Sequence, residues 1–268
     1  MALVLAIANQ KGGVGKTTTA VNLAASLAAS ERPVLLVDLD PQGNASSGVG
    51  VARERSDRPT LYHALVGAAP ARSAIRNTEL PHLAVLPSDA DLVGAELELV
   101  GAEERETRLR EALAPVRVDY EFVLIDCPPS LGLLTLNALV AADRVLVPLQ
   151  CEYYALEGLG SLLRTVELVR NGLNRDLALE GVVLTMFDAR NNLARQVMAD
   201  VQSNLPGQVY ATVIPRNVRL SEAPSHGQPA LLYDVESKGA QSYLGLAQEL
   251  LRRCASGAAA HERQRARA

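Results

Sequence analysis

The stretch Gln10-Lys11-Gly12-Gly13-Val14-Gly15-Lys16-Thr17-Thr18 decides how this chain folds. An apolar run, residues 3–8, precedes it, and an alanine- and leucine-rich segment without glycine or proline, residues 16–29, follows. Strand, glycine-rich loop and helix in this order place the N–H groups of the helix's first turn where an anion can bind. The pattern predicts a phosphate-binding P-loop, in which Lys16 reaches the β- and γ-phosphates and the Thr17 hydroxyl holds Mg²⁺. The alternative is a glycine-rich turn that only lets a helix pack close to a strand.

Lysine usage favours the P-loop. Only three of the 26 basic residues are lysines, and two of them, Lys11 and Lys16, lie in this loop. We interpret both as lysines needed for a compact charge on a flexible stem, which arginine does not provide. Two features depart from the ordinary pattern G-x-x-x-x-G-K-[ST]: Gln10 stands where that pattern has glycine, and Lys11 is an additional lysine.

Composition bounds the remaining possibilities. The 268 residues suffice for one large α/β domain, and the 48% hydrophobic content suffices for its core. The net charge of −4 excludes a globally basic DNA-coating protein but leaves room for a local arginine patch, and 3% aromatic residues argue against a stacking platform for single strands. The three cysteines are far apart and indicate neither a disulfide framework nor a zinc or iron–sulfur site. With no signal peptide and no apolar run approaching a membrane span, we expect a cytoplasmic protein.

Apolar strand candidates alternate with helical stretches. The predicted strands are 3–8, 33–38, 83–87, 121–126, 144–149, 179–186 and 209–214, and the predicted helices are 16–29, 60–66, 89–112, 132–141, 155–172, 193–203 and 237–254. This alternation predicts a single-domain α/β fold of the P-loop NTPase type, with a mostly parallel twisted sheet and helices on both faces. We expect the domain to span residues 1–254, residues 50–60 to form a surface loop, and the basic tail 255–268 to be disordered.

Two apolar runs end in aspartate, where open α/β sheets place their ligands. The first ends in Asp38-Leu39-Asp40-Pro41 and the second in Asp126-Cys127-Pro128-Pro129. A nucleotide-hydrolysing P-loop protein needs such a carboxylate for the hydration shell of Mg²⁺, and Asp126 is the better candidate. The alternative for each aspartate is a turn or cap that closes a strand. The pattern alone leaves open which of Asp38, Asp40 and Asp126 positions water.

Several blocks together resemble the ParA/MinD family of P-loop ATPases, which carry a deviant Walker A motif. They look most like its chromosome-partitioning branch, ParA/Soj. The matching blocks are Lys11 to Thr18, Val37 to Ala45, Asp126 to Ser130, Glu152 to Gly158 and Ile214 to Ser225. They extend the resemblance over residues 3 to about 250 and are far more specific than the P-loop alone.

The resemblance implies a role for each matching residue. Lys11 matches the signature lysine that crosses an ATP-sandwich dimer to the partner's phosphates. Asp40 matches the aspartate that orients the attacking water, and Asp126 matches Walker B, which holds Mg²⁺ through water. The other implied nucleotide contacts are Gly12, Gly13, Val14, Gly15, Lys16, Thr17, Thr18, Pro215 and Asn217. The implied DNA-phosphate contacts are Arg190 and Arg219, with Arg195 and Arg216 beside them; their alternative is a solvated or internally paired surface.

The family's activity is the further implication. It comprises slow, Mg²⁺-dependent ATP hydrolysis in a homodimer that binds double-stranded DNA without sequence preference, associates with the nucleoid and is reset by a ParB-type centromere-binding protein. Whether a chromosome or a plasmid is partitioned stays open.

Three other functions on this scaffold fit the sequence less well. A MinD-like division-site ATPase would need a C-terminal amphipathic helix with bulky apolar residues, and after Leu250-Leu251 the tail offers none. A metal-cluster carrier on this scaffold would need paired cysteines. Lys11 and the block Pro215–Ser225 argue against a synthetase of the dethiobiotin type.

Overall fold

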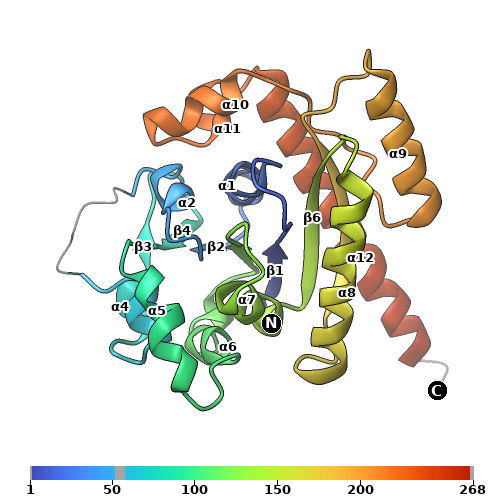
Figure 1. Ribbon diagram of the computed structural model, residues 1–268. Helices are drawn as coiled ribbons and strands as arrows, with labels where there is room; N and C mark the ends of the chain where they lie inside the picture. The colour runs from blue at the N-terminus through green and yellow to red at the C-terminus, as the bar shows by residue number, and fades with distance from the viewer. Residues whose placement is uncertain (1, 52–57, 266–268) are drawn as a thin grey trace.

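The computed structural model describes residues 2–51 and 58–265, and of residues 257–265 it describes the backbone alone. Its centre is a seven-stranded sheet in the order β3-β4-β2-β5-β1-β6-β7 (Figure 1). The strands are β1 (Leu3–Ile7), β2 (Val34–Asp38), β3 (Arg76–Asn77), β4 (Leu83–Leu86), β5 (Phe122–Asp126), β6 (Arg144–Gln150) and β7 (Ala178–Thr185). All neighbours pair in parallel except the two-residue edge strand β3, which runs antiparallel to β4.

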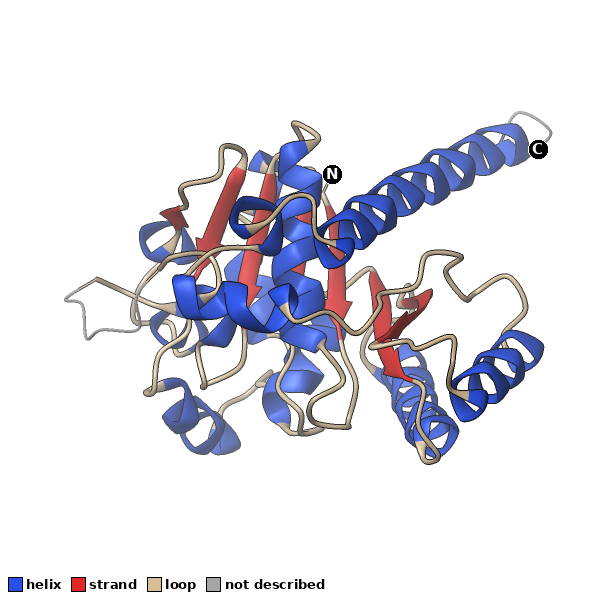
Figure 2. Cartoon of the chain, turned by 90° about the horizontal axis from the view of Figure 1, so that it is seen from above, coloured by secondary structure: helices blue, strands red, loops and turns tan. Residues whose placement is uncertain are grey.

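Helices cover both faces of this sheet, as Figure 2 shows. The α-helices are α1 (Lys16–Ala29), α2 (Asn44–Ser47), α3 (Leu61–Leu65), α4 (Ala71–Ala74), α5 (Leu92–Glu98), α6 (Arg108–Leu113), α7 (Leu133–Ala141), α8 (Ala155–Gly172), α9 (Asn192–Asn204), α10 (Arg219–Glu222), α11 (Ala230–Tyr233) and α12 (Lys238–Arg265). Three 3₁₀ turns, η1 (Leu99–Gly101), η2 (Arg117–Asp119) and η3 (Ala223–His226), complete the described elements. None of the helices in the described part of the chain is long and apolar enough to span a membrane.

The sheet separates two hydrophobic layers, because successive strand residues point to opposite faces. On β1, Val4 and Ala6 pack into the layer that α7 and α8 cover, whereas Leu5 and Ile7 pack into the layer under α1 and α12. Apart from the edge strand β3, the strands are largely buried on both faces, which explains why they read as continuous apolar runs. The predicted fold class is therefore confirmed.

One predicted strand does not form. Residues 209–214 make only isolated bridges with their neighbours, Val182 with Val209 and Phe187 with Pro215. Between these bridges, the N–H groups of Ala211 and Thr212 donate to the Glu249 carboxylate of α12, each at 2.9 Å. Because these two N–H groups are bonded to a side chain, they cannot form the backbone hydrogen bonds of a β-strand.

Two of the predicted helices also differ from the helices in the structure. The predicted helix 89–112 is broken into α5, η1 and α6, because the chain turns at Gly101 and Glu104, the latter with φ +52°. The last helix is longer than predicted: α12 continues as helix to Arg265, where disorder was expected from residue 255. The alanine-rich composition of residues 255–265 favours helix. Of the predicted loop 50–60, residues 52–57 lie outside the described residues.

Candidate functional site

The glycine-rich loop connects β1 to α1 at the carboxyl edge of the sheet. Gly13 and Gly15 have φ angles of +73° and +87°, in the region that favours glycine. Thr185 of β7 fixes the loop from outside by donating its hydroxyl to the Val14 carbonyl at 2.8 Å. Asn9 fixes it from within: its side chain accepts from the Lys11 N–H at 3.0 Å and donates to the Pro148 carbonyl at 2.8 Å. The loop is therefore held in shape by the protein itself.

Lys16 begins α1, and its ammonium group is buried behind this loop. It donates to the Lys11 carbonyl at 3.0 Å. Burial lowers the pKa of this ammonium, and the nearby Asp126, Cys127 and Asp40 oppose the shift. A buried ammonium beside backbone N–H groups at a helix N-terminus is an arrangement that binds phosphate.

Asp38 and Asp126 lie opposite each other in the register of β2 and β5. Asp38 is fully hydrogen-bonded: one oxygen accepts from the Ser46 N–H and hydroxyl, both at 2.7 Å, and the other accepts from the Asp40 N–H at 3.3 Å. Burial raises the pKa of Asp38 to about 6, and the Ser46 bonds oppose this shift. Asp38 thus holds the start of α2 against the sheet and has no free oxygen for water or metal.

Asp126 has the opposite environment. It is 0% exposed, and neither carboxylate oxygen has a hydrogen-bond partner of good geometry among the described residues. Burial raises its pKa well above the usual value and Asp38 adds to this, while the Thr17 hydroxyl and the Lys16 ammonium oppose it. A buried carboxylate without partners is costly, and a hydrated Mg²⁺ would supply the missing donors. Asp126 and Thr17 therefore fit a magnesium site completed by phosphate and water.

Asp40 lies two residues beyond Asp38, at the edge of the buried site. One oxygen accepts from the Gln42 N–H at 2.9 Å, and the side chain is near enough to Lys16 to act on its pKa. Because Asp38 is committed to Ser46, Asp40 is the carboxylate of this loop that remains near the phosphate position.

A pocket of about 120 Å³ lies beside the P-loop, on the side of β7 and α12. Pro215 and Asn217, both predicted to meet the adenine, line it together with Gly15 and Thr18. Met186 and Tyr243 complete its wall, and sequence reasoning missed both. Met186 has a φ of +49°, a backbone conformation that cannot be predicted from the sequence around it. Tyr243 belongs to the last helix, more than two hundred residues after the P-loop.

Lys11 begins the glycine-rich stretch, and its side chain is 39% exposed. Its ammonium forms an ion pair with Glu152, which also accepts from the Gln150 amide. Tyr153 and Tyr154 follow Glu152 and are 76% and 66% exposed. Exposed aromatic rings beside the phosphate site are unusual on a free surface and are typical of contacts between proteins.

Two of the four predicted DNA-contact arginines, Arg190 and Arg216, lie near the same carboxylate, Asp188. Arg190 is 91% exposed and pairs with Asp188 at 2.8 Å; this bond lowers the pKa of Asp188 to about 2, and Arg216 adds to the effect. Arg219 pairs with Glu222 at 2.8 Å and Asp234 at 3.1 Å. Arg195 lies on α9 and donates to Asn192. The acidic partners mean that Arg190 and Arg219 would exchange an internal ion pair for any phosphate contact.

Comparison with known proteins agrees with this geometry. The AAA_31 family (AAA domain) matches residues 2–179. The chromosome partitioning protein ParA of Myxococcus xanthus is 58% identical over 93% of this chain and 88% of its own length, and the sporulation initiation inhibitor protein Soj of Bacillus subtilis is 57% identical over 93% and 98%.

Among solved structures, cobyrinic acid a,c-diamide synthase from Mycobacterium smegmatis with bound ADP and magnesium is 41% identical, with a TM-score of 0.84 over 96% of this chain and 97% of that one. Relatives this similar over nearly the full length share more than the P-loop. The chain therefore belongs to the ParA/Soj family of P-loop ATPases.

Proposed function

We propose that this protein is a DNA-partitioning ATPase that switches between a free form and an ATP-bound dimer on DNA. Its close relatives ParA and Soj support the partitioning role. The observation that carries the proposal is the contrast between two lysines of the loop. Lys16 is buried, whereas the Lys11 side chain is 39% exposed and, among the described residues, its ammonium is paired only with Glu152.

ATP would lie along the P-loop, with its phosphates on the N–H groups of residues 12–18 and its base in the pocket of Pro215 and Asn217. Mg²⁺, when bound, neutralises charge on the β- and γ-phosphates. Thr17 and Asp126 would hold it, the latter through water, and Asp40 would position the attacking water.

Lys11 would leave Glu152 and reach the phosphates of a second subunit, with Tyr153 and Tyr154 in the contact. Two subunits facing each other double the surface of Arg190, Arg195, Arg216 and Arg219. The contacts of these arginines with DNA phosphates are weak individually. In the dimer they would act together, and they would not depend on the base sequence of the DNA. A ParB-type partner would stimulate hydrolysis and release the dimer. We place this cycle in the cytoplasm, on the nucleoid.

A mobility shift on random duplex DNA, with ATP, ADP or no nucleotide and across a salt series, tests this proposal. We expect binding with ATP only, with log affinity falling by about 0.9 per phosphate neutralised and per decade of salt. Arg190→Glu and Arg219→Glu should abolish the shift while gel filtration still shows the ATP-dependent dimer.

Arg170→Glu on α8 is the matched control, since Arg170 is exposed and distant from the four arginines in sequence. Equal binding in all three nucleotide states would contradict the switch. An unchanged shift in both charge reversals would show that these arginines only form a solvated, internally paired surface. ATP-dependent binding to lipid vesicles would instead favour the MinD-like function.

A further inference from the structure

Ser46 of α2 is a buried residue whose side chain joins the ends of two strands. Its hydroxyl donates to the Asp38 carboxylate at 2.7 Å and accepts from the Ser88 N–H at 3.2 Å. Asp38 ends β2, and Ser88 lies two residues beyond the end of β4. Ser46 is 2% exposed and Ser88 is 4% exposed, so loss of either bond would leave a buried polar group without a partner.

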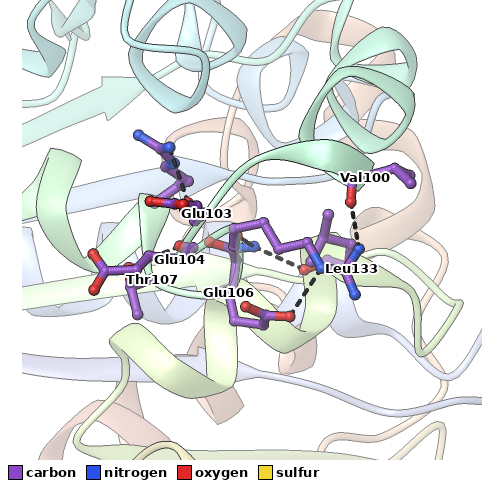
Figure 3. Close-up of polar contacts among 9 residues, drawn as sticks. Val100, Glu103, Glu104, Glu106, Thr107 and Leu133 are labelled. Atoms are coloured by element: carbon purple, nitrogen blue, oxygen red, sulfur yellow. Dashed lines mark hydrogen bonds and ion pairs between the residues drawn. The ribbon is translucent and has the colours of Figure 1, made fainter.

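This connection differs from the local bonds that other polar side chains make. In the segment 100–107, the Thr107 hydroxyl donates to the Glu104 carbonyl at 2.9 Å, and Arg105 donates to the Val100 carbonyl at 2.7 Å (Figure 3). Those bonds hold the shape of one short segment. The Ser46 hydroxyl instead connects residues that are 8 and 42 positions away in the chain.

The segment around Ser88 is itself fixed on both sides. The Pro87 carbonyl accepts from the Leu61 N–H at 2.9 Å. The Asp89 carboxylate accepts from the hydroxyl of Thr60, the residue that caps α3, at 2.7 Å. Through Ser46, α2 is therefore tied to a part of the protein that neither precedes nor follows it directly in the chain.

The loop 39–43, which carries Asp40, lies between the two points that Ser46 connects. On one side, the Asp40 N–H donates to Asp38 at 3.3 Å. On the other side, the Gly43 N–H donates to the Asp40 carbonyl at 2.9 Å, just before α2 begins. Because Ser46 holds α2 against the end of β2, it sets the span that this loop must bridge. The place of Asp40 therefore depends on Ser46.

We propose that Ser46 is a positioning residue for hydrolysis: its bonds to Asp38 and Ser88 hold α2 so that Asp40 can orient the attacking water. In the described part of the chain, Ser46 forms no hydrogen bond with the phosphate loop, residues 10–18. Its loss should therefore slow hydrolysis without weakening ATP binding. The inference rests on the proposed function in one respect, the role of Asp40.

Ser46→Ala is the first test. We expect kcat without any partner to fall at least about tenfold, because a displacement of about 1 Å in a reacting group costs up to roughly a hundredfold. The Kd for a fluorescent ATP analogue should stay at the wild-type value. Ser46→Thr keeps the hydroxyl and should restore most of the rate, whereas Ser46→Cys keeps the size but donates weakly and should not.

Ser47→Ala is the matched control. Ser47 is the same residue type in the same helix, and its hydroxyl donates only to the Gly43 carbonyl at 3.0 Å, which also accepts from the Ser47 N–H at 3.1 Å. We expect the wild-type rate in this variant. Asn174→Ala controls for loss of stability, because the Asn174 amide bonds three carbonyls at residues 139–142, before the amino end of β6.

The double variant Asp40→Ala, Ser46→Ala separates positioning from a general structural role. If Ser46 acts through Asp40, the double variant should hydrolyse ATP no more slowly than Asp40→Ala alone, because residues that act as a unit are not additive. Single-turnover hydrolysis measures all four rates of this cycle, and urea denaturation confirms that each variant is folded.

A wild-type rate in Ser46→Ala would overturn the positioning role. A loss in the double variant that multiplies the two single losses would also overturn it, since Ser46 would then act independently of Asp40. Failure of the proposed function would look different, because Asp40→Ala alone would then hydrolyse ATP at the wild-type rate.

Discussion

Strands β2 and β5 each end in an aspartate, Asp38 and Asp126. The two residues are neighbours in the register of the sheet but have opposite hydrogen-bonding environments. Asp38 receives three hydrogen bonds from Ser46 and Asp40, whereas the buried Asp126 receives none of good geometry among the described residues. Both have raised pKa values because both are buried. The difference teaches that burial and position at a strand end do not identify a functional carboxylate. The unsatisfied carboxylate is the one that the fold leaves available to a ligand.

Asp126→Asn should have the largest effect. Without its carboxylate the site loses the group that we propose to hold hydrated Mg²⁺, and we expect hydrolysis to fall by roughly 10²–10³-fold. The same change removes a costly buried carboxylate that faces the carboxyl group of Asp38, so the nucleotide-free protein should gain about 1–3 kcal/mol in its free energy of unfolding. Urea denaturation with and without Mg-ATP measures both effects. A variant that is less stable without nucleotide would show that Asp126 is satisfied after all.

Asp40→Ala should slow hydrolysis roughly hundredfold, because a misplaced water costs about that factor, and should leave ATP binding unchanged. The hydrogen bond that Asp40 accepts from the Gln42 N–H contributes only a little to the free energy of unfolding. Single-turnover hydrolysis and equilibrium titration with a fluorescent ATP analogue separate the two. Wild-type turnover would move the water-positioning role to Asp126.

Asp38→Asn should mainly change how the free energy of unfolding depends on pH. The folded-state pKa of Asp38, about 6, lies above its ordinary value of 3.8, so the folded protein holds this proton more tightly than the unfolded chain. Stability from this group is full below pH about 4 and is lost as pH rises to about 6, an effect on the order of 2–3 kcal/mol. The variant should flatten that slope in urea titrations. The exposed control Asp176→Asn should keep the wild-type slope.

Much of the fold follows from local pattern, but the two carboxylates could not be told apart from it. The strand runs ending in Asp38 and Asp126 are both apolar, both buried and followed by proline within a few residues. What separates them is Ser46, eight residues after Asp38, whose N–H and hydroxyl reach back to it. That contact depends on how α2 folds against β2, which no periodicity encodes.

The prediction of a strand at residues 209–214 was wrong for a similar reason. Its apolar residues have the composition of a buried strand, yet Glu249 from the last helix takes the N–H groups of Ala211 and Thr212. The wall of the small pocket likewise depends on Met186 and Tyr243, which tertiary packing brings to Gly15. The phosphate half of the candidate site is one continuous segment that local sequence can describe, whereas the residues of the other half were assigned only through family resemblance.

The division of the pocket between distant segments has a consequence for the synthesis of the protein. The phosphate loop, residues 10–18, leaves the ribosome early, whereas Pro215 and Asn217 are made about 200 residues later. At about 5–20 residues per second, that interval is roughly 10–40 s. During this time a nascent chain has the glycine-rich loop but lacks the pocket wall that we propose to hold the base. Nucleotide can therefore stabilise the completed protein selectively, and a prematurely released fragment that ends before residue 215 gains little from the cell's ATP.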